Sequence, residues 1–100
     1  DRQLTERLAR AGARPVTAVT TDLFYDPRAG LEERWRSQGA SVVEMEAATL
    51  FKMGGVYGFA AGCVCGVIAQ RSEAETPDLA AKVLAVDRAI AVAVAAADAL

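Results

Sequence analysis

The stretch ASVVEMEAATLF, residues 40–51, decides how the rest of the chain is interpreted. Two valines run directly into Glu44, Met45 and Glu46, and residues that favour helix follow them. This pattern predicts a short strand that delivers Glu-Met-Glu to the start of a helix. A carboxylate near the positive end of a helix dipole can stay ionised while it faces a polar ligand.

The same stretch also fits a purely structural interpretation. Ser41 and Glu44 have the spacing of a capping box, in which Ser41 caps the helix and Glu44 reaches back to it. Capping boxes are common, so these residues alone leave both interpretations open.

The composition indicates one small globular domain. The chain has 100 residues, of which 53% are hydrophobic, and its net charge is −2. Basic and acidic residues are intermixed without a basic block, so nucleic acid is not an expected partner. Charged residues interrupt the last apolar segment, so we expect no membrane helix. The chain begins with Asp1 and shows no signal-like segment, and we therefore expect a piece of a longer protein.

Histidine is absent, which removes the commonest general base and the commonest metal ligand. Cys63 and Cys65 are one residue apart in an apolar run, lack further ligand partners and are too close for easy disulfide geometry. We expect them to be buried free thiols in a reduced cytoplasm, and we expect no metal.

Helices and strands are expected to alternate along the chain. Helices are predicted at 2–11 and 31–38, in the run that follows Glu46 and continues to Gly54-Gly55, and at 79–100. Strands are predicted at 16–21, in the opening stretch, and at 59–68, the last of these buried on both faces. This alternation predicts an α/β domain with a mostly parallel sheet.

Three polar clusters follow the predicted strands: Asp22–Arg28, Glu44–Glu46 and Gln70–Ser72. Ligands bind at the carboxyl ends of strands in parallel sheets, so the convergence of three clusters favours a ligand site over a simple helix cap. Phe24 and Tyr25, within the first cluster, fit either a lid on the core or a ligand contact.

Three motifs carry a family resemblance. They are VEMEAATL at 43–50, TDLFY at 21–25 and GVIAQR at 66–71, with Arg71 placed 25 residues after Glu46. In order and spacing they resemble the nucleoside phosphorylases of the uridine phosphorylase group. The resemblance implies a three-layer α/β/α phosphorylase-type fold with a mixed, largely parallel sheet. Residues 1–100 would be the C-terminal part of a single domain of about 250 residues.

The resemblance also implies a reaction. Phosphate, as co-substrate and without a cofactor, would convert a nucleoside to free base and ribose 1-phosphate in nucleoside catabolism and salvage. The enzyme would be a cytoplasmic homo-oligomer. The family's phosphate site uses a Gly-rich loop and arginines that have no match here. The chain alone is therefore expected to be inactive and to expose sheet edges and apolar faces.

The resemblance assigns a role to each matching residue. Glu46 would bind the ribose 2′- and 3′-hydroxyls, Met45 would lie against the sugar, and Glu44 would act as a helix cap as much as a substrate contact. Catalysis would rest on Glu46 and Arg71, the latter stabilising negative charge on the leaving base. The base pocket would include the stacking ring of Phe24, the wall residues Ile68 and Ala69, and Arg28 and Arg71 at the polar edge.

The sequence departs from the family's motifs at two places that bear on which base the enzyme would accept. Uridine phosphorylases often follow Phe-Tyr with a glutamine and an arginine, whereas here only Arg28 is present. Purine enzymes and related nucleosidases typically carry a Ser-Asp pair after the strand that corresponds to 59–68. The first acid after this run here is Glu73, which lies several residues away from the position of that aspartate. A pyrimidine nucleoside, uridine above all, is favoured. The alternatives are a purine phosphorylase or nucleosidase of the same superfamily, a nucleoside-binding fragment without catalysis, and a plain α/β domain.

Overall fold

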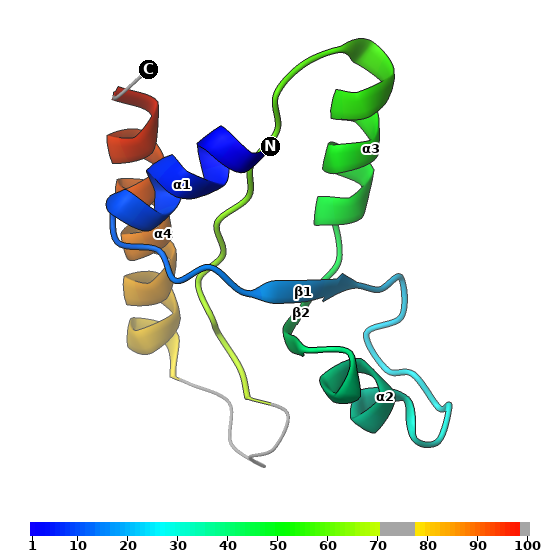
Figure 1. The fold of residues 1–100 in the computed structure, drawn as a ribbon. Helices are drawn as coiled ribbons and strands as arrows, with labels where there is room; N and C mark the ends of the chain where they lie inside the picture. Colours follow the sequence, from blue (N-terminus) through cyan, green and yellow to red (C-terminus); the bar gives the residue numbers. More distant parts are fainter. Residues whose placement is uncertain (71–77, 99–100) are drawn as a thin grey trace. The chain divides into compact units, whose positions relative to one another are not determined.

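The computed structural model describes residues 1–70 and 78–98, which belong to two compact units. Unit 1 contains Asp1 and Pro15–Ala61, and unit 2 contains Arg2–Arg14 and the chain from Gly62 onward (Figure 1). The predicted Arg71, Ser72 and Glu73 lie outside the described residues.

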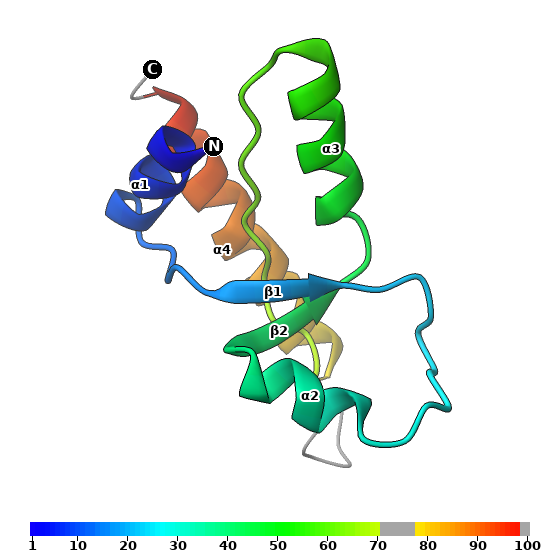
Figure 2. The same cartoon turned by 45° about the vertical axis from the view of Figure 1, so that its right-hand side comes forward.

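Unit 1 is built around one strand–helix–strand crossover. β1 (Thr17–Thr20) and β2 (Ala40–Glu44) pair in parallel, and α2 (Leu31–Ser37) connects them and packs against β2 (Figure 2). Parallel strands require such a crossover because a tight hairpin would reverse the chain. The register pairs Val19 with Val43 and Thr20 with Glu44, so both strands end at the same edge.

Helix α2 follows the predicted amphipathic pattern. The predicted pair of Glu32 and Arg36 is present, with 3.8 Å between charged atoms. The Arg36 side chain is 61% exposed and that of Glu32 is 39% exposed, so solvent screens this ion pair and it contributes little to stability.

Helix α3 (Ala47–Tyr57) begins directly after Glu-Met-Glu, as predicted, but its cap and its C-terminal end differ from the prediction. Ser41 is an exposed residue within β2, so the capping box with Ser41 as the cap is wrong. The helix also continues past Gly54-Gly55 to Tyr57, and its C-cap residue, Gly58, has a left-handed φ of 77°. Gly54 is buried because the returning chain crosses it: a Cβ there would lie 2.8 Å from the carbonyl oxygen of Phe59.

Unit 2 consists of two helices and an irregular segment. α1 (Arg2–Arg10) packs against α4 (Leu79–Asp98), which begins where Asp78 Oδ1 accepts the Ala81 N–H at 2.8 Å. Gly66 lies so close to α4 that a Cβ would be 2.5 Å from the carbonyl oxygen of Ala85.

The strand predicted at 59–68 is wrong, since no residue from 59 to 70 belongs to a strand. A strand needs a neighbour for its N–H and C=O groups, and in the described residues β1 and β2 pair only with each other. Cys63 and Cys65 form no disulfide, as predicted, but they are exposed rather than buried. Their sulfur atoms are 3.6 Å apart.

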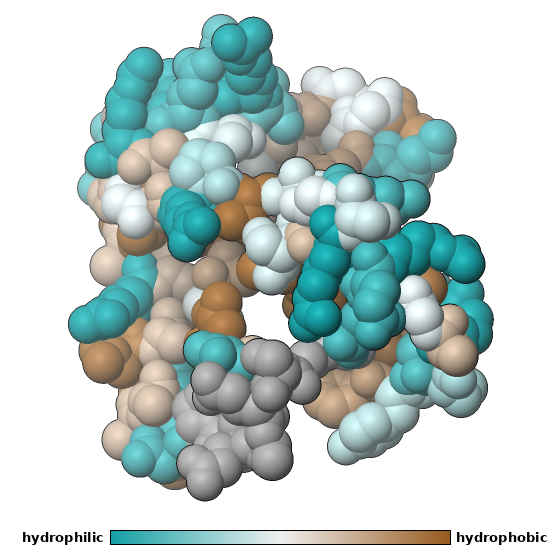
Figure 3. Space-filling model, turned by 60° about the horizontal axis from the view of Figure 1, so that its bottom comes forward, coloured by the Kyte–Doolittle hydropathy of each residue, from teal (hydrophilic) through white to brown (hydrophobic). Residues whose placement is uncertain are grey.

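The buried apolar residues of the described chain are three alanines, Ala47, Ala61 and Ala96. No large side chain among the described residues is fully buried, and Tyr57 and Leu79 are 73% and 77% exposed. Apolar side chains therefore reach the surface, as Figure 3 shows for one face. This confirms the prediction of exposed apolar faces. The structure shows a partial α/β domain with a two-stranded parallel sheet.

Candidate functional site

The candidate site begins where the two parallel strands end. Thr20 and Glu44 are register partners, and the Thr20 hydroxyl donates a hydrogen bond to Glu44 Oε1. The next backbone N–H, that of Thr21, donates to the carbonyl oxygen of Glu44 at 3.0 Å. Two of the predicted polar clusters therefore begin side by side, as the parallel topology requires.

Glu44 and Thr20 together cap helix α3. Glu44 Oε2 accepts the N–H groups of Glu46 at 2.7 Å and Ala47 at 2.6 Å, and Thr20 Oγ1 accepts that of Ala48 at 3.0 Å. Backbone donors in the first turn of a helix have no partner within the helix, and here two side chains satisfy three of them. The capping role predicted for Glu44 is confirmed, with a different partner from Ser41.

The electrostatics of Glu44 follow from these contacts. Partial desolvation raises the pKa of its carboxyl, but the hydrogen bonds from Thr20, Ala47 and Glu46 lower it more, so the pKa lies below its ordinary value. An ionised carboxylate has about four acceptor positions. Three are filled by the Thr20 hydroxyl and the two N–H groups, which leaves one for a ligand hydroxyl.

Glu46 is placed differently from Glu44. It occupies the N-cap position of α3 with φ −132°, is exposed, and makes no side-chain capping hydrogen bond. Met45 beside it is 36% exposed. The two acids therefore have different roles: Glu44 caps the helix, and the exposed side chain of Glu46 takes no part in the cap.

The loop after β1 carries two exposed aromatic rings. Phe24 and Tyr25 are 66% and 88% exposed, and their rings meet edge to face with centroids 4.9 Å apart. The alternative in which they form a lid on the core is wrong, because such exposure is incompatible with packing against it. Thr21, at the start of the loop, is buried, and its hydroxyl accepts the Leu23 N–H at 3.3 Å.

Arg28 is paired within this loop. Its Nε and Nη2 donate to the two carboxylate oxygens of Asp26 at 2.9 and 2.6 Å. The hydrogen bond and the charge of Asp26 raise the pKa of Arg28. A base edge would therefore compete with Asp26 for this guanidinium.

Of the third cluster, only Gln70 lies within the described residues. Ile68, Ala69 and Gln70 belong to unit 2, where they are exposed and irregular, and Arg71 and Ser72 lie outside the described residues. Thr20 is the residue that sequence reasoning missed. A threonine that ends a strand is unremarkable until the register places Glu44 opposite it.

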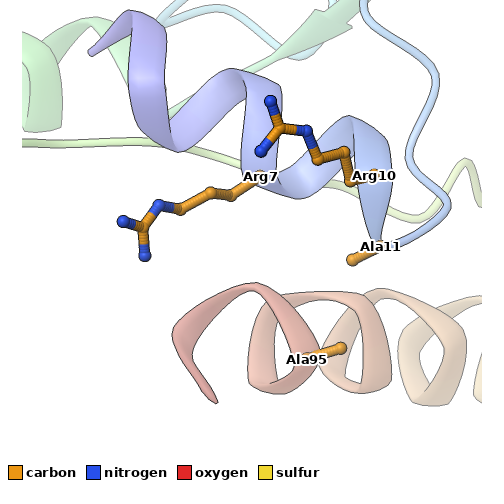
Figure 4. A pocket seen from close by; sticks show the side chains of 4 residues that line it. All are labelled: Arg7, Arg10, Ala11 and Ala95. Atoms are coloured by element: carbon orange, nitrogen blue, oxygen red, sulfur yellow. The ribbon is translucent and has the colours of Figure 1, made fainter. Parts of the chain in front are cut away.

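A separate hollow of about 380 Å³ lies in unit 2, lined by Arg7, Arg10, Ala11 and Ala95. Both arginines extend from α1, and the alanines lie where α1 and α4 approach (Figure 4). Nη1 of Arg7 is buried without a hydrogen-bond partner. The lining offers neither a carboxylate nor a nucleophile.

Across residues 1–70 and 78–98, no three histidine, cysteine, aspartate or glutamate side chains gather as a metal site. The helices of this part of the chain also lack the combined length and apolar content needed to cross a membrane.

A crossover unit with acidic and hydroxyl side chains at its strand ends defines an α/β protein with polar groups placed for a ligand. The sequence profile of the phosphorylase superfamily matches residues 2–100, so the chain belongs to that superfamily.

Curated relatives are uridine phosphorylases. The chain is 38% identical over 71 residues to that of Haemophilus influenzae, covering 71% of this chain and 28% of the relative. It is 37% identical over 83 residues to that of Thermococcus kodakarensis, covering 68% and 30%. With the Escherichia coli enzyme, 49 residues are 43% identical, covering 49% and 19%. The chain spans less than a third of the length of these relatives.

Proposed function

We propose that the protein containing this chain catalyses phosphorolysis of a pyrimidine nucleoside, with uridine the favoured substrate. A phosphate oxygen forms the new bond to C1′ of ribose as the C1′–N bond to the base breaks. The products are ribose 1-phosphate and the free base, which takes up a proton. The enzyme is thus a pentosyltransferase of nucleoside catabolism and salvage.

One observation carries the proposal: Glu46 is exposed at the strand–helix junction while Glu44 is engaged in the cap. A carboxylate that the helix does not use is available to two adjacent hydroxyls, and its two oxygens match the ribose 2′- and 3′-hydroxyls. Glu44 adds one acceptor position, and Met45 supplies an apolar contact to the sugar.

The base is assigned to the aromatic loop and to the third cluster. Phe24 stacks on the base, which an exposed ring permits. Ile68 and Ala69 are assigned to the apolar contacts of the base, and Arg71 is assigned to its polar edge. A cation there favours the negative charge that develops on the leaving base. Arg28 is also assigned to the polar edge of the base, where the base would compete with Asp26 for its guanidinium.

Residues 1–100 are proposed to form the C-terminal part of one phosphorylase domain, inactive without the remainder. The short coverage of the relatives supports a partial domain, as do the apolar side chains left exposed. Phosphate, the co-substrate, is assigned to the remainder, and no cofactor is required. We further infer a cytoplasmic homo-oligomer, in a compartment where the thiols of Cys63 and Cys65 stay reduced.

The test is an assay of the intact protein with uridine, thymidine, inosine or adenosine, with and without phosphate. Phosphate-dependent formation of uracil and ribose 1-phosphate is expected. Preference for inosine or adenosine would contradict the pyrimidine assignment, and free ribose formed without phosphate would indicate a nucleosidase. Binding of nucleosides without any product would contradict catalysis altogether.

A further inference from the structure

The hydroxyl of Thr20 connects three elements through one oxygen atom. It donates to Glu44 Oε1 at the end of β2 and accepts from the N–H of Ala48 in the first turn of α3. Thr20 itself ends β1. A hydroxyl offers one donor and two acceptor positions, so Thr20 uses its donor and one acceptor here.

These contacts determine where Glu46 lies. The backbone N–H of Glu46 is bound by Glu44 Oε2, and Glu44 is oriented through its other oxygen by Thr20. On the other side of Glu46, Ala48 is attached to the same Thr20 hydroxyl. The position of Glu46 therefore depends on two backbone hydrogen bonds, one at its own N–H and one at the N–H of Ala48, and both involve Thr20 directly or through Glu44.

The residue type suits this task. Threonine is branched at Cβ and has restricted χ1 freedom in a strand, so its hydroxyl is aimed before a ligand arrives. Loss of the hydroxyl would leave Glu44 Oε1 and the Ala48 N–H without this partner. Small errors in the placement of a binding group cost catalytic rate heavily, because the reacting geometry must be held closely.

We propose that Thr20 is a positioning residue, which sets the Glu44 carboxylate and the first turn of α3 and so places Glu46 for the ribose hydroxyls. The inference rests on the proposed function for its ligand. It goes beyond that function by assigning control of the sugar site to a residue on a different strand, which does not itself contact the substrate.

The test compares Thr20→Val, Thr20→Ser and Thr17→Val in the intact protein. Valine keeps the branched shape without the hydroxyl, serine keeps the hydroxyl, and Thr17 is an exposed residue of the same strand. We expect Thr20→Val to lower kcat/KM for uridine roughly 10- to 100-fold, with the KM for phosphate changed less than about twofold. Thr20→Ser should restore activity to within about threefold, and Thr17→Val should resemble the unaltered protein.

Unchanged uridine kinetics in Thr20→Val would overturn the inference. The inference would also be overturned if Thr20→Val and Thr20→Ser lost kcat/KM equally and their melting temperatures fell in proportion. A structural role alone would explain that pattern. If the valine variant does not fold, Thr20→Cys keeps the volume with a much weaker hydrogen-bonding group. It should show a uridine defect in the same direction, and normal kinetics would contradict the inference.

Amide hydrogen exchange separates this inference from the proposed function. The Ala48 amide should exchange faster in Thr20→Val than in the unaltered protein, with or without any substrate. If the protein turns over no nucleoside, the proposed function fails. The exchange result still tests whether the Thr20 hydroxyl holds the first turn of α3, which is the connection between Thr20 and Ala48. Equal exchange of Ala48 in both proteins would overturn the connection itself.

Discussion

The carboxylate of Glu44 and the backbone N–H of Ala47 are 2.6 Å apart, so the last side chain of strand β2 caps the helix that follows it. This arrangement makes the strand end and the helix start one structural unit. Removing the charge should therefore disturb both.

Glu44→Gln should lower stability at neutral pH by about 1 kcal/mol, the usual scale for a helix cap. The pKa of Glu44 in the folded protein lies below its ordinary 4.5, so its contribution is complete above that value and is lost as pH falls through the folded-state pKa. Denaturant unfolding at pH 7, 4 and 3 measures the free energy of unfolding of both proteins. The difference between the variant and the unaltered protein should become smaller as the pH is lowered. A difference that grows in acid would contradict the ionised cap.

Glu46→Gln should leave stability unchanged and weaken nucleoside binding. The carboxylate takes no part in the cap, and a hydrogen bond to a charged group contributes about 1.5–3 kcal/mol, or roughly 10- to 100-fold in affinity. Titration calorimetry with uridine and a thermal melt measure the two effects. Glu33→Gln, an exposed acid on α2, is the control. Lost stability with unchanged binding would assign Glu46 to the helix instead.

Gly54→Ala and Gly55→Ala should act in opposite directions although the residues are adjacent in α3. A methyl at Gly54 meets the Phe59 carbonyl at 2.8 Å, whereas a methyl at Gly55 meets no atom within 4 Å. Alanine at Gly55 should raise stability by about 0.5–1 kcal/mol through helix propensity. Alanine at Gly54 should lower the melting temperature. Stabilisation at both positions would show that the chain does not cross at Gly54.

Arg7→Met should leave stability equal or higher, because it removes a buried nitrogen that has no hydrogen-bond partner. The methionine retains most of the apolar stem, so the packing of that stem is kept. An orphaned buried donor costs about 1–3 kcal/mol, which sets the upper limit of the gain. Arg10→Met, on the same helix and exposed, is the comparison in a thermal melt. A clear loss for Arg7→Met alone would reveal a partner for that nitrogen.

Phe24→Ala should weaken uridine binding by about 1–3 kcal/mol, the range for a base stacked on an aromatic ring. Because Phe24 is 66% exposed, the melting temperature should change little. Tyr25→Ala, at the more exposed neighbour, tests whether the effect belongs to one ring. Equal losses of affinity would assign the contact to the pair of rings.

Much of the local structure was predictable because its causes are local. The i,i+4 pair of Glu32 and Arg36 and the valines of β2 each carry a signal within a few residues. The strand at 59–68 was not, since an apolar run forms a strand only beside a partner strand, and in the described residues the sheet consists of β1 and β2 alone. Exposure of Cys63 and Cys65 follows from the same cause.

By itself, the sequence determined that Glu-Met-Glu stands at a strand–helix junction, because hydrophobic pattern and helix propensity are properties of neighbouring residues. Only the tertiary structure decided which side chain completes the cap with Glu44, namely Thr20 and not Ser41. Those roles depend on the parallel register, which brings together side chains separated by 24 residues. A contact of that kind arises from the approach of two strands, and no local preference of either one specifies it.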